Sequence, residues 1–180
     1  MDKAKLALLR AELTAQMRQI EAIYNKIEER RRSGGQAELE SLGYQLHNLY
    51  CAFEDLFEVI AGTFENQIDE KRRYHIELLR RLTVAIEGVR PALLSPESYR
   101  LLDNLRAFRY FFRHAYSFEL DERKVRLVLD DALKLKDLYR GDLDRFLLAL
   151  EESAISPGLD TQESETRARG KPEPKDTERI

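Results

Sequence analysis

The residues best suited to chemistry form a short run of arginines, aromatics and one histidine. Residues 106–118 contain three arginines, one histidine and no acidic residue, with aromatic side chains interleaved among them. At about 100° per helical residue, one face of a helix would carry Arg106, Arg109, Arg113 and Tyr116. His114 lies about 80° around the axis from Arg106. The spacing therefore predicts a guanidinium-rich helix face flanked by an imidazole and a phenol.

Such a group suits the cleavage of a phosphodiester without a metal ion. A guanidinium matches the geometry of phosphoryl oxygens and stays charged while negative charge builds in the transition state. An imidazole titrates near neutral pH, so it can take the proton of a ribose 2′-hydroxyl or deliver one to the leaving 5′-oxygen. RNA supplies its own nucleophile, so we expect the reaction to need no cofactor and no metal.

Each of these residues also has an ordinary structural interpretation. Phenylalanines at helical spacing are typical core residues, and this applies to Phe108, Phe111 and Phe112. Arg106 and Arg113 could form a solvated face that pairs with acids of a neighbouring helix. His114, taken alone, is typical of a surface or satisfied core histidine, and Tyr116 could cap the core at the helix end.

The pattern Arg109-x-x-x-x-His114-x-Tyr116, in an aromatic-rich helix of a helical chain, resembles the signature of the HEPN superfamily. It is most similar to the HepT-like ribonuclease toxins paired with MntA-type nucleotidyltransferase antitoxins. The resemblance covers residues 1–150, and its specific part is the stretch 106–116. It implies a metal-independent endoribonuclease toxin, a homodimer in which the Arg and His of both protomers meet at the two-fold interface. By this resemblance, Arg109 and His114 are catalytic, and Tyr116 is the residue that the partner enzyme modifies with AMP.

One position departs from the family pattern. Members commonly carry a polar residue, often Asn, directly after the motif Arg, whereas this chain has Tyr110. Asn104 could supply the missing amide, and together with Arg106 and Arg113 it forms the expected set of RNA phosphate-binding residues. The alternative is a non-catalytic HEPN module that binds RNA or a protein partner, and Tyr110 is the residue that favours it.

The elements that must position these residues are helices throughout. Apolar residues at steps of three and four predict helices over residues 3–32, 37–64, 69–89, 96–116 and 121–150. Ser95 and Pro96 are a helix entry signal, while Gly34 and Pro91 mark helix ends. No stretch alternates like a strand. The sequence therefore predicts an all-α, up-and-down bundle of about five helices, HEPN-like in fold.

Two other groups could carry chemistry. The second predicted helix bears Tyr44, His47, Tyr50 and Cys51 at steps of three or four. His47 and Cys51 could form a nucleophile pair, but four such residues among leucines and phenylalanines are more typical of core lining. His75 lies in a charged stretch and is expected to be solvated, and the basic residues 71–73 beside it could contact an RNA backbone. No GxGxxG, P-loop, HExxH or EF-hand spacing occurs.

Composition separates a body from a tail. Residues 151–180 hold eight acids and five bases, so the 33 acids and 30 bases of the chain leave 25 of each in residues 1–150. The net charge of −3 therefore belongs to the tail. Because the tail has few aliphatic residues, it cannot bury enough apolar surface to offset chain entropy. We expect one domain over residues 1–154 and a disordered, charged tail over residues 155–180.

The chain carries no sequence signal for a membrane or for secretion. No window approaches 18 uninterrupted apolar residues, and the first residues run directly into helical sequence without an apolar signal core. A single cysteine, Cys51, permits no internal disulfide, and with three histidines it leaves no zinc cluster. These features favour a cytoplasmic protein without a membrane partner.

Overall fold

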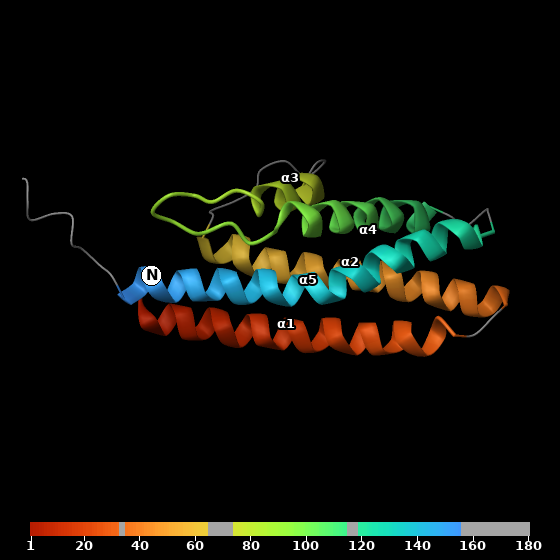
Figure 1. Ribbon diagram of the computed structural model, residues 1–180, viewed down its shortest axis with the longest axis horizontal. Coiled ribbons are helices and arrows are strands. Elements are labelled where there is room, and N and C mark those ends of the chain that lie inside the picture. The colour runs from red at the N-terminus through yellow and green to blue at the C-terminus, as the bar shows by residue number, and fades with distance from the viewer. Residues whose placement is uncertain (33–34, 65–73, 115–118, 156–180) are drawn as a thin grey trace, which may run out of the picture.

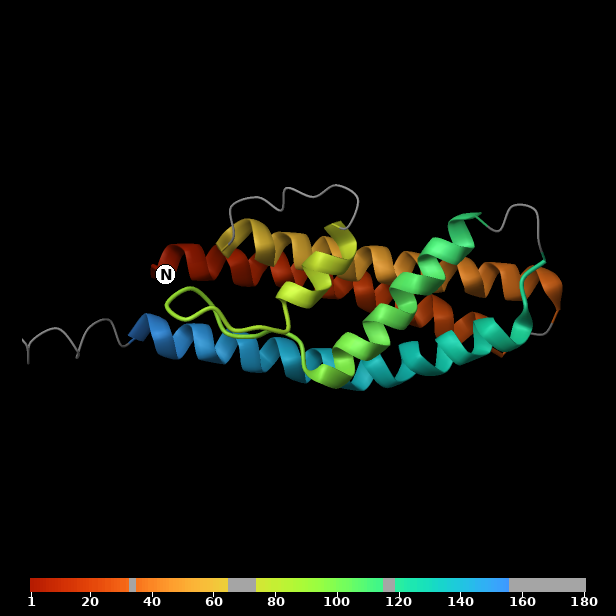
Figure 2. The same cartoon turned by 90° about the horizontal axis from the view of Figure 1, so that it is seen from above.

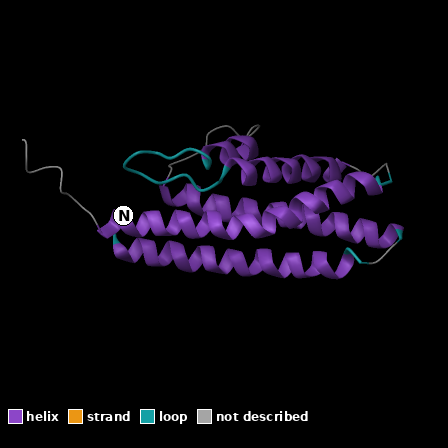
Figure 3. Cartoon of the chain, viewed as in Figure 1, coloured by secondary structure: helices purple, strands orange, loops and turns teal. Residues whose placement is uncertain are grey.

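The computed structural model describes residues 1–32, 35–64, 74–114 and 119–155. These residues form helices α1 (Lys3–Arg30), α2 (Gln36–Phe64), α3 (Tyr74–Arg81), α4 (Pro96–His114) and α5 (Glu122–Ile155). Figure 3 shows that the described part of the chain contains helices and loops and no strand. The prediction of an all-α bundle of about five helices is confirmed. The predicted tail, apart from its first residue, lies outside the described residues.

The four long helices run up and down (Figure 1). α1 and α2 lie side by side along their length, and α5 returns beside α1 so that its end lies near the start of the chain. An ion pair between Arg10 and Glu151 joins these two ends. α4 crosses over α2 and α5 at an angle, and the short α3 lies beside its first half (Figure 2). The residues of α4 therefore face two long helices at once.

A single core fills the space between the helices. The apolar stripe of α1, which includes Leu13, Ile20 and Ile27, is almost completely buried. Tyr24 is buried as well, and its hydroxyl donates a hydrogen bond to the carbonyl oxygen of Ala132 at 3.0 Å. Each fully buried side chain of this size contributes about 1.5–3 kcal/mol relative to exposure. This core gives α2 and α5 fixed positions on which α4 can pack.

The start of α4 is fixed by the entry signal that the sequence predicts. The hydroxyl of Ser95 accepts a hydrogen bond from the backbone N–H of Ser98 at 3.2 Å. A carboxylate oxygen of Asp142 on α5 accepts from the backbone N–H and hydroxyl of Ser95 at 3.0 and 3.1 Å. Asp142 is buried, so these bonds form in an environment where an unpaired carboxylate would be costly. The register of α4 against α5 is therefore set at its first turn.

The third helix ends earlier than the sequence predicts. The expected helix over residues 69–89 is wrong at its end, because α3 ends at Arg81 and a tight turn joins Ile86 to Arg90. Gly88 in this turn has a φ of +72°, which favours glycine. The buried guanidinium of Arg90 donates to the carbonyl oxygens of Arg81 and Val84 at 3.1 and 2.9 Å. These bonds satisfy carbonyls that a longer helix would have used.

Close approach of α2 to its neighbours depends on Gly43. A Cβ atom at this position would lie 2.9 Å from Cε2 of Phe112 on α4 and 3.1 Å from Cδ1 of Leu120. The ring of Phe112 is itself packed against His47 and Phe108, with ring centroids 5.7 and 5.8 Å apart. A side chain at position 43 would therefore have to move a ring that is already in contact on two sides.

We expect Gly43→Ala to lower the free energy of unfolding by about 1–2 kcal/mol, because the strain of overpacking exceeds the gain in helix propensity. Gly62→Ala on the same helix is the matched control. A Cβ at Gly62 meets nothing within 4 Å, so this variant should gain up to about 1 kcal/mol. Urea unfolding of both variants measures the difference. Equal effects at the two positions would contradict a tight α2–α4 contact.

Among the described residues, no helix is both long enough and apolar enough to cross a bilayer.

Candidate functional site

The three arginines in the second half of α4, Arg106, Arg109 and Arg113, lie on the side of the helix that approaches α2. Arg106 and Arg109 both act electrostatically on Tyr50 of α2, and Arg109 and Arg113 both act on His47. The side chains of Arg106 and Arg109 are 23% and 15% exposed, whereas Arg113 is exposed at the end of the helix. The arginine face that the spacing predicts is thus turned partly inward.

Arg109 is the most enclosed of the three arginines. Its Nε donates a hydrogen bond to Sγ of Cys51 at 3.4 Å, and its Nη2 forms an ion pair with Oε2 of Glu54 at 3.4 Å. The guanidinium carbon lies 5.9 Å from the centre of the Tyr50 ring. Contacts at both Nε and Nη2 restrict the rotation of the guanidinium, because both nitrogens lie along one edge of its plane.

Glu54 connects this arginine to a third helix. Its side chain is 9% exposed, and its second carboxylate oxygen, Oε1, forms an ion pair with Nδ1 of His75 on α3. Burial raises the pKa of Glu54, while His75 and Arg109 act in the opposite direction. The carboxylate therefore lies between two groups that favour its charged form. The expectation of a merely solvated His75 is wrong: the side chain is 42% exposed and pairs with Glu54.

His47 and Cys51 lie beside Arg109 and are half-buried. Sγ of Cys51 and Nε2 of His47 are 3.8 Å apart. Burial lowers the pKa of His47, and the positive charges of Arg109 and Arg113 lower it further, so this imidazole is neutral near pH 7. The predicted core lining holds for Tyr50, which is buried, and is wrong for Tyr44, which is 53% exposed.

His114 points away from Arg109. Five helical residues separate the two, which places their side chains about 140° apart around α4. Nδ1 of His114 donates to the carbonyl oxygen of Tyr110 at 2.7 Å, and the two rings pack with centroids 4.5 Å apart. This bond leaves Nε2 as the proton acceptor of the neutral imidazole. His114 is exposed at the end of α4, on a different side of the helix from the half-buried Arg109.

Asn104 is not brought to the arginine face. Its amide nitrogen donates to a carboxylate oxygen of Asp131 on α5 at 2.8 Å. It lines a groove between α4 and α5 together with Phe108 and Phe111, on another side of α4 from Arg109. Asn104 therefore does not stand in for the amide that Tyr110 lacks. Tyr116 lies outside the described residues, so its predicted position beside the arginines stays a prediction.

Sequence reasoning missed Glu54. It occupies the apolar face of α2, next to the buried Phe53 and one turn after Tyr50. A carboxylate in such a position needs a cationic partner, since an unpaired buried charge is costly. This single acid among phenylalanines and leucines was the signal that could have predicted an inward-turned arginine or histidine.

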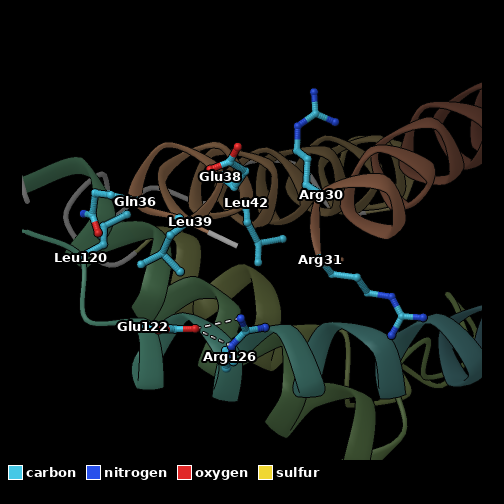
Figure 4. Close-up of a pocket in the computed structure, with 10 residues that line it drawn as sticks. Arg30, Arg31, Gln36, Glu38, Leu39, Leu42, Leu120, Glu122 and Arg126 are labelled. Carbon is cyan, nitrogen blue, oxygen red and sulfur yellow. Dashed lines mark hydrogen bonds and ion pairs between the residues drawn. The ribbon is translucent and has the colours of Figure 1, made fainter. Parts of the chain in front are cut away.

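A separate pocket of about 220 Å³ lies at the end of the bundle where α1 turns into α2 (Figure 4). Its walls include Leu39, Leu42 and Leu120, with arginines at the rim. All three rim arginines have partners in the described part of the chain: Arg126 pairs with Glu122, Arg31 pairs with Glu28, and Nε of Arg30 donates to the hydroxyl of Ser41. The pocket contains none of the residues around Arg109 and is not part of the candidate site.

The protein is thus a small helical bundle in which α4 packs against α2. Arg109 of α4 pairs there with the buried carboxylate of Glu54 on α2. A family model described as HepT-like protein matches residues 41–150, so the chain belongs to the HepT-like family of the HEPN superfamily. The matched range spans the candidate residues of α2, α3 and α4 and the segment that contains Tyr116. Comparison with curated proteins found no match, and neither did comparison with solved structures.

Proposed function

We propose that this protein is a metal-independent endoribonuclease of the toxin type, with Arg109 and His114 as its catalytic residues. Membership of the HepT-like family supports an RNase module of this kind. The observation that carries the proposal furthest is the guanidinium of Arg109, held at Nε by Cys51 and at Nη2 by Glu54. A preorganised cation of this kind needs little rearrangement when a phosphate arrives.

In this reaction, Arg109 binds the scissile phosphate and stabilises the charge that develops on it. His114 takes the proton of the 2′-hydroxyl through Nε2, and the imidazolium that results can return a proton to the leaving 5′-oxygen. The exposed Arg113 at the end of α4 supplies further positive charge for a neighbouring phosphate. Nε of the half-buried Arg106 donates to Asp103 at 2.7 Å, so Arg106 would have to exchange this partner for a phosphate.

The divergence of Arg109 and His114 within one chain supports a site shared between two copies. Their side chains lie about 140° apart around α4, so one phosphate cannot contact both side chains of the same chain easily. Two protomers related by a two-fold axis would bring Arg109 of one copy to His114 of the other. Tyr110 and Phe111, which flank His114, are 69% and 37% exposed and would supply apolar area to such an interface.

Chelation is the first test of this chemistry. Purified protein incubated with total RNA should cleave it equally well with and without EDTA, because the guanidinium and imidazole carry out the reaction without a metal. Gel electrophoresis of the RNA measures the extent of cleavage. Loss of cleavage in EDTA that Mg²⁺ restores would place the protein in another catalytic class.

The second candidate function is a HEPN module that binds RNA or a protein without cleaving it. The exposed Tyr110 in place of the usual amide favours it, as does the engagement of Asn104 by Asp131. Binding of RNA by the purified protein without any cleavage product would support this candidate over the enzyme.

We further propose that a cognate nucleotidyltransferase of the MntA type silences the protein by attaching AMP to Tyr116. A phosphate placed there would pair with the exposed Arg113 and compete with RNA for the cationic face. Incubation with such an enzyme and ATP should add about 329 Da per AMP and abolish cleavage. Tyr116→Phe should stay active and resist silencing. An adduct on Tyr110 instead would transfer the regulatory role to that residue.

A further inference from the structure

We propose that His75 is a positioning residue for Arg109 and acts on it through the buried carboxylate of Glu54. The proposal rests on the proposed function of Arg109 and adds a third helix to the site. The proposal is based on how the Glu54 carboxylate is shared. Its Oε2 forms an ion pair with Nη2 of Arg109, and its Oε1 forms an ion pair with Nδ1 of His75.

A carboxylate held at one oxygen can still rotate about its last bond. With a partner on each oxygen its plane is fixed, and so is the direction in which Oε2 presents its lone pairs. Arg109 depends on that direction, since Oε2 of Glu54 and Sγ of Cys51 are its two described polar contacts. Loss of His75 would therefore free Glu54 to turn and let the guanidinium drift from its present plane.

His75 also acts on the charge of Glu54. Burial raises the pKa of this carboxyl, the nearby Glu58 raises it further, and His75 and Arg109 lower it. The hydroxyl of Tyr50 lies in the same surroundings, and its own pKa is raised by burial and by Glu54. Without His75, Glu54 would take up a proton at a higher pH. A neutral carboxyl would no longer balance the guanidinium of Arg109.

His75 contributes little to holding α3 in place. The packing of α3 comes from Leu78 and Leu79, which are 2% and 1% exposed, and from Leu82 just after it. His75 is 42% exposed and lies in the first turn of the helix. A substitution at His75 should therefore preserve the fold and test its effect on Arg109 in isolation. Arg80 is exposed on the same helix and offers a matched loss of charge.

The experiment compares His75→Leu, His75→Gln and the control Arg80→Gln in the full-length protein. The first readout is the titration of the Glu54 carboxyl carbon by NMR, which needs no RNase activity. We expect its midpoint to rise by about one pH unit in both His75 variants and to stay unchanged in Arg80→Gln. The second readout is exchange of the Arg109 Nε–H with water, which should become faster in His75→Leu.

The third readout is the pH profile of RNA cleavage. His75→Leu should lower kcat about tenfold with a smaller change in KM, because the guanidinium is misplaced. Its activity should also start to fall at a higher pH on the acidic side. His75→Gln keeps a hydrogen-bond donor, so its kcat at alkaline pH should stay within about threefold of wild type.

The proposal would be overturned if Glu54 titrated with the same midpoint in wild type, His75→Leu and Arg80→Gln. It would also be overturned if the Arg109 Nε–H exchanged at the wild-type rate in His75→Leu. A wild-type protein without RNase activity would contradict the proposed function only. In that case the two NMR readouts still decide whether His75 positions Arg109.

Discussion

Arg109→Lys should lower kcat/KM for RNA cleavage by about two to three orders of magnitude while the protein stays folded. Lysine keeps a positive charge beside Glu54 but has no planar fork. It cannot contact Cys51, Glu54 and a phosphate at the same time, as the guanidinium can. Steady-state cleavage of a labelled RNA measures the loss, and circular dichroism monitors the fold.

The choice of lysine follows from the burial of Arg109. The side chain of Arg109 is 15% exposed and pairs with a buried carboxylate, so Arg109→Ala would disturb folding as well as activity. Removing it altogether should cost up to about 3 kcal/mol of stability, since among the described residues Glu54 would keep only His75 as an ion-pair partner. Arg100→Lys is the matched control, because it makes the same replacement at an exposed position on the same helix. Wild-type activity in Arg109→Lys would exclude Arg109 from the site.

His114→Gln should lower the cleavage rate by about 10²–10⁴-fold, the usual contribution of a general acid–base group. Because His114 is exposed at the end of α4, the free energy of unfolding should change by less than about 0.5 kcal/mol. A large activity loss without a stability loss separates chemistry from folding. An active His114→Gln protein would show that another group moves the proton.

Mixing the two inactive variants tests the shared site. If Arg109 of one copy works with His114 of the other, heterodimers of Arg109→Lys and His114→Gln contain a position at which both wild-type side chains meet. The mixture should then regain activity that neither variant has alone. Sedimentation of the wild type should give about twice the 21.1 kDa chain mass. A monomer with full activity would contradict the shared site.

Helix periodicity predicted most of the fold. α1 and α2 begin and end within about two residues of the predicted bounds, and α4 begins at the predicted residue, whereas its predicted end lies outside the described residues. α5 begins one residue after the predicted start but continues to Ile155, five residues past the predicted end. The third helix differs because its end depends on Arg90, nine residues after Arg81 in sequence. The Arg90 guanidinium donates to the carbonyl oxygen of Arg81, the last residue of α3, and to that of Val84 in the turn that follows. A contact made by a loop that folds back is not visible in local periodicity.

The candidate site was only half predictable. Spacing along one helix predicted that Arg106, Arg109 and Arg113 share a face, because that follows from 100° per residue alone. The same arithmetic shows that His114 is turned away from Arg109, and the structure adds that its Nδ1 is committed to Tyr110. The position of Asn104 against Asp131 could not be foreseen, since it depends on how α4 lies on α5.

By itself, the sequence determined that the chain forms amphipathic helices and that one of them concentrates arginines where residues 106–118 hold no acid. Tertiary structure decided which charges meet. It brings Glu54, which is 55 residues before Arg109, into contact with that arginine, and brings His75 to the same carboxylate. The physical reason is that helix geometry depends on local sequence, whereas the partner of a buried charge depends on how separate helices pack. A buried charge without a partner would destabilise the fold, so the packing must bring one to it.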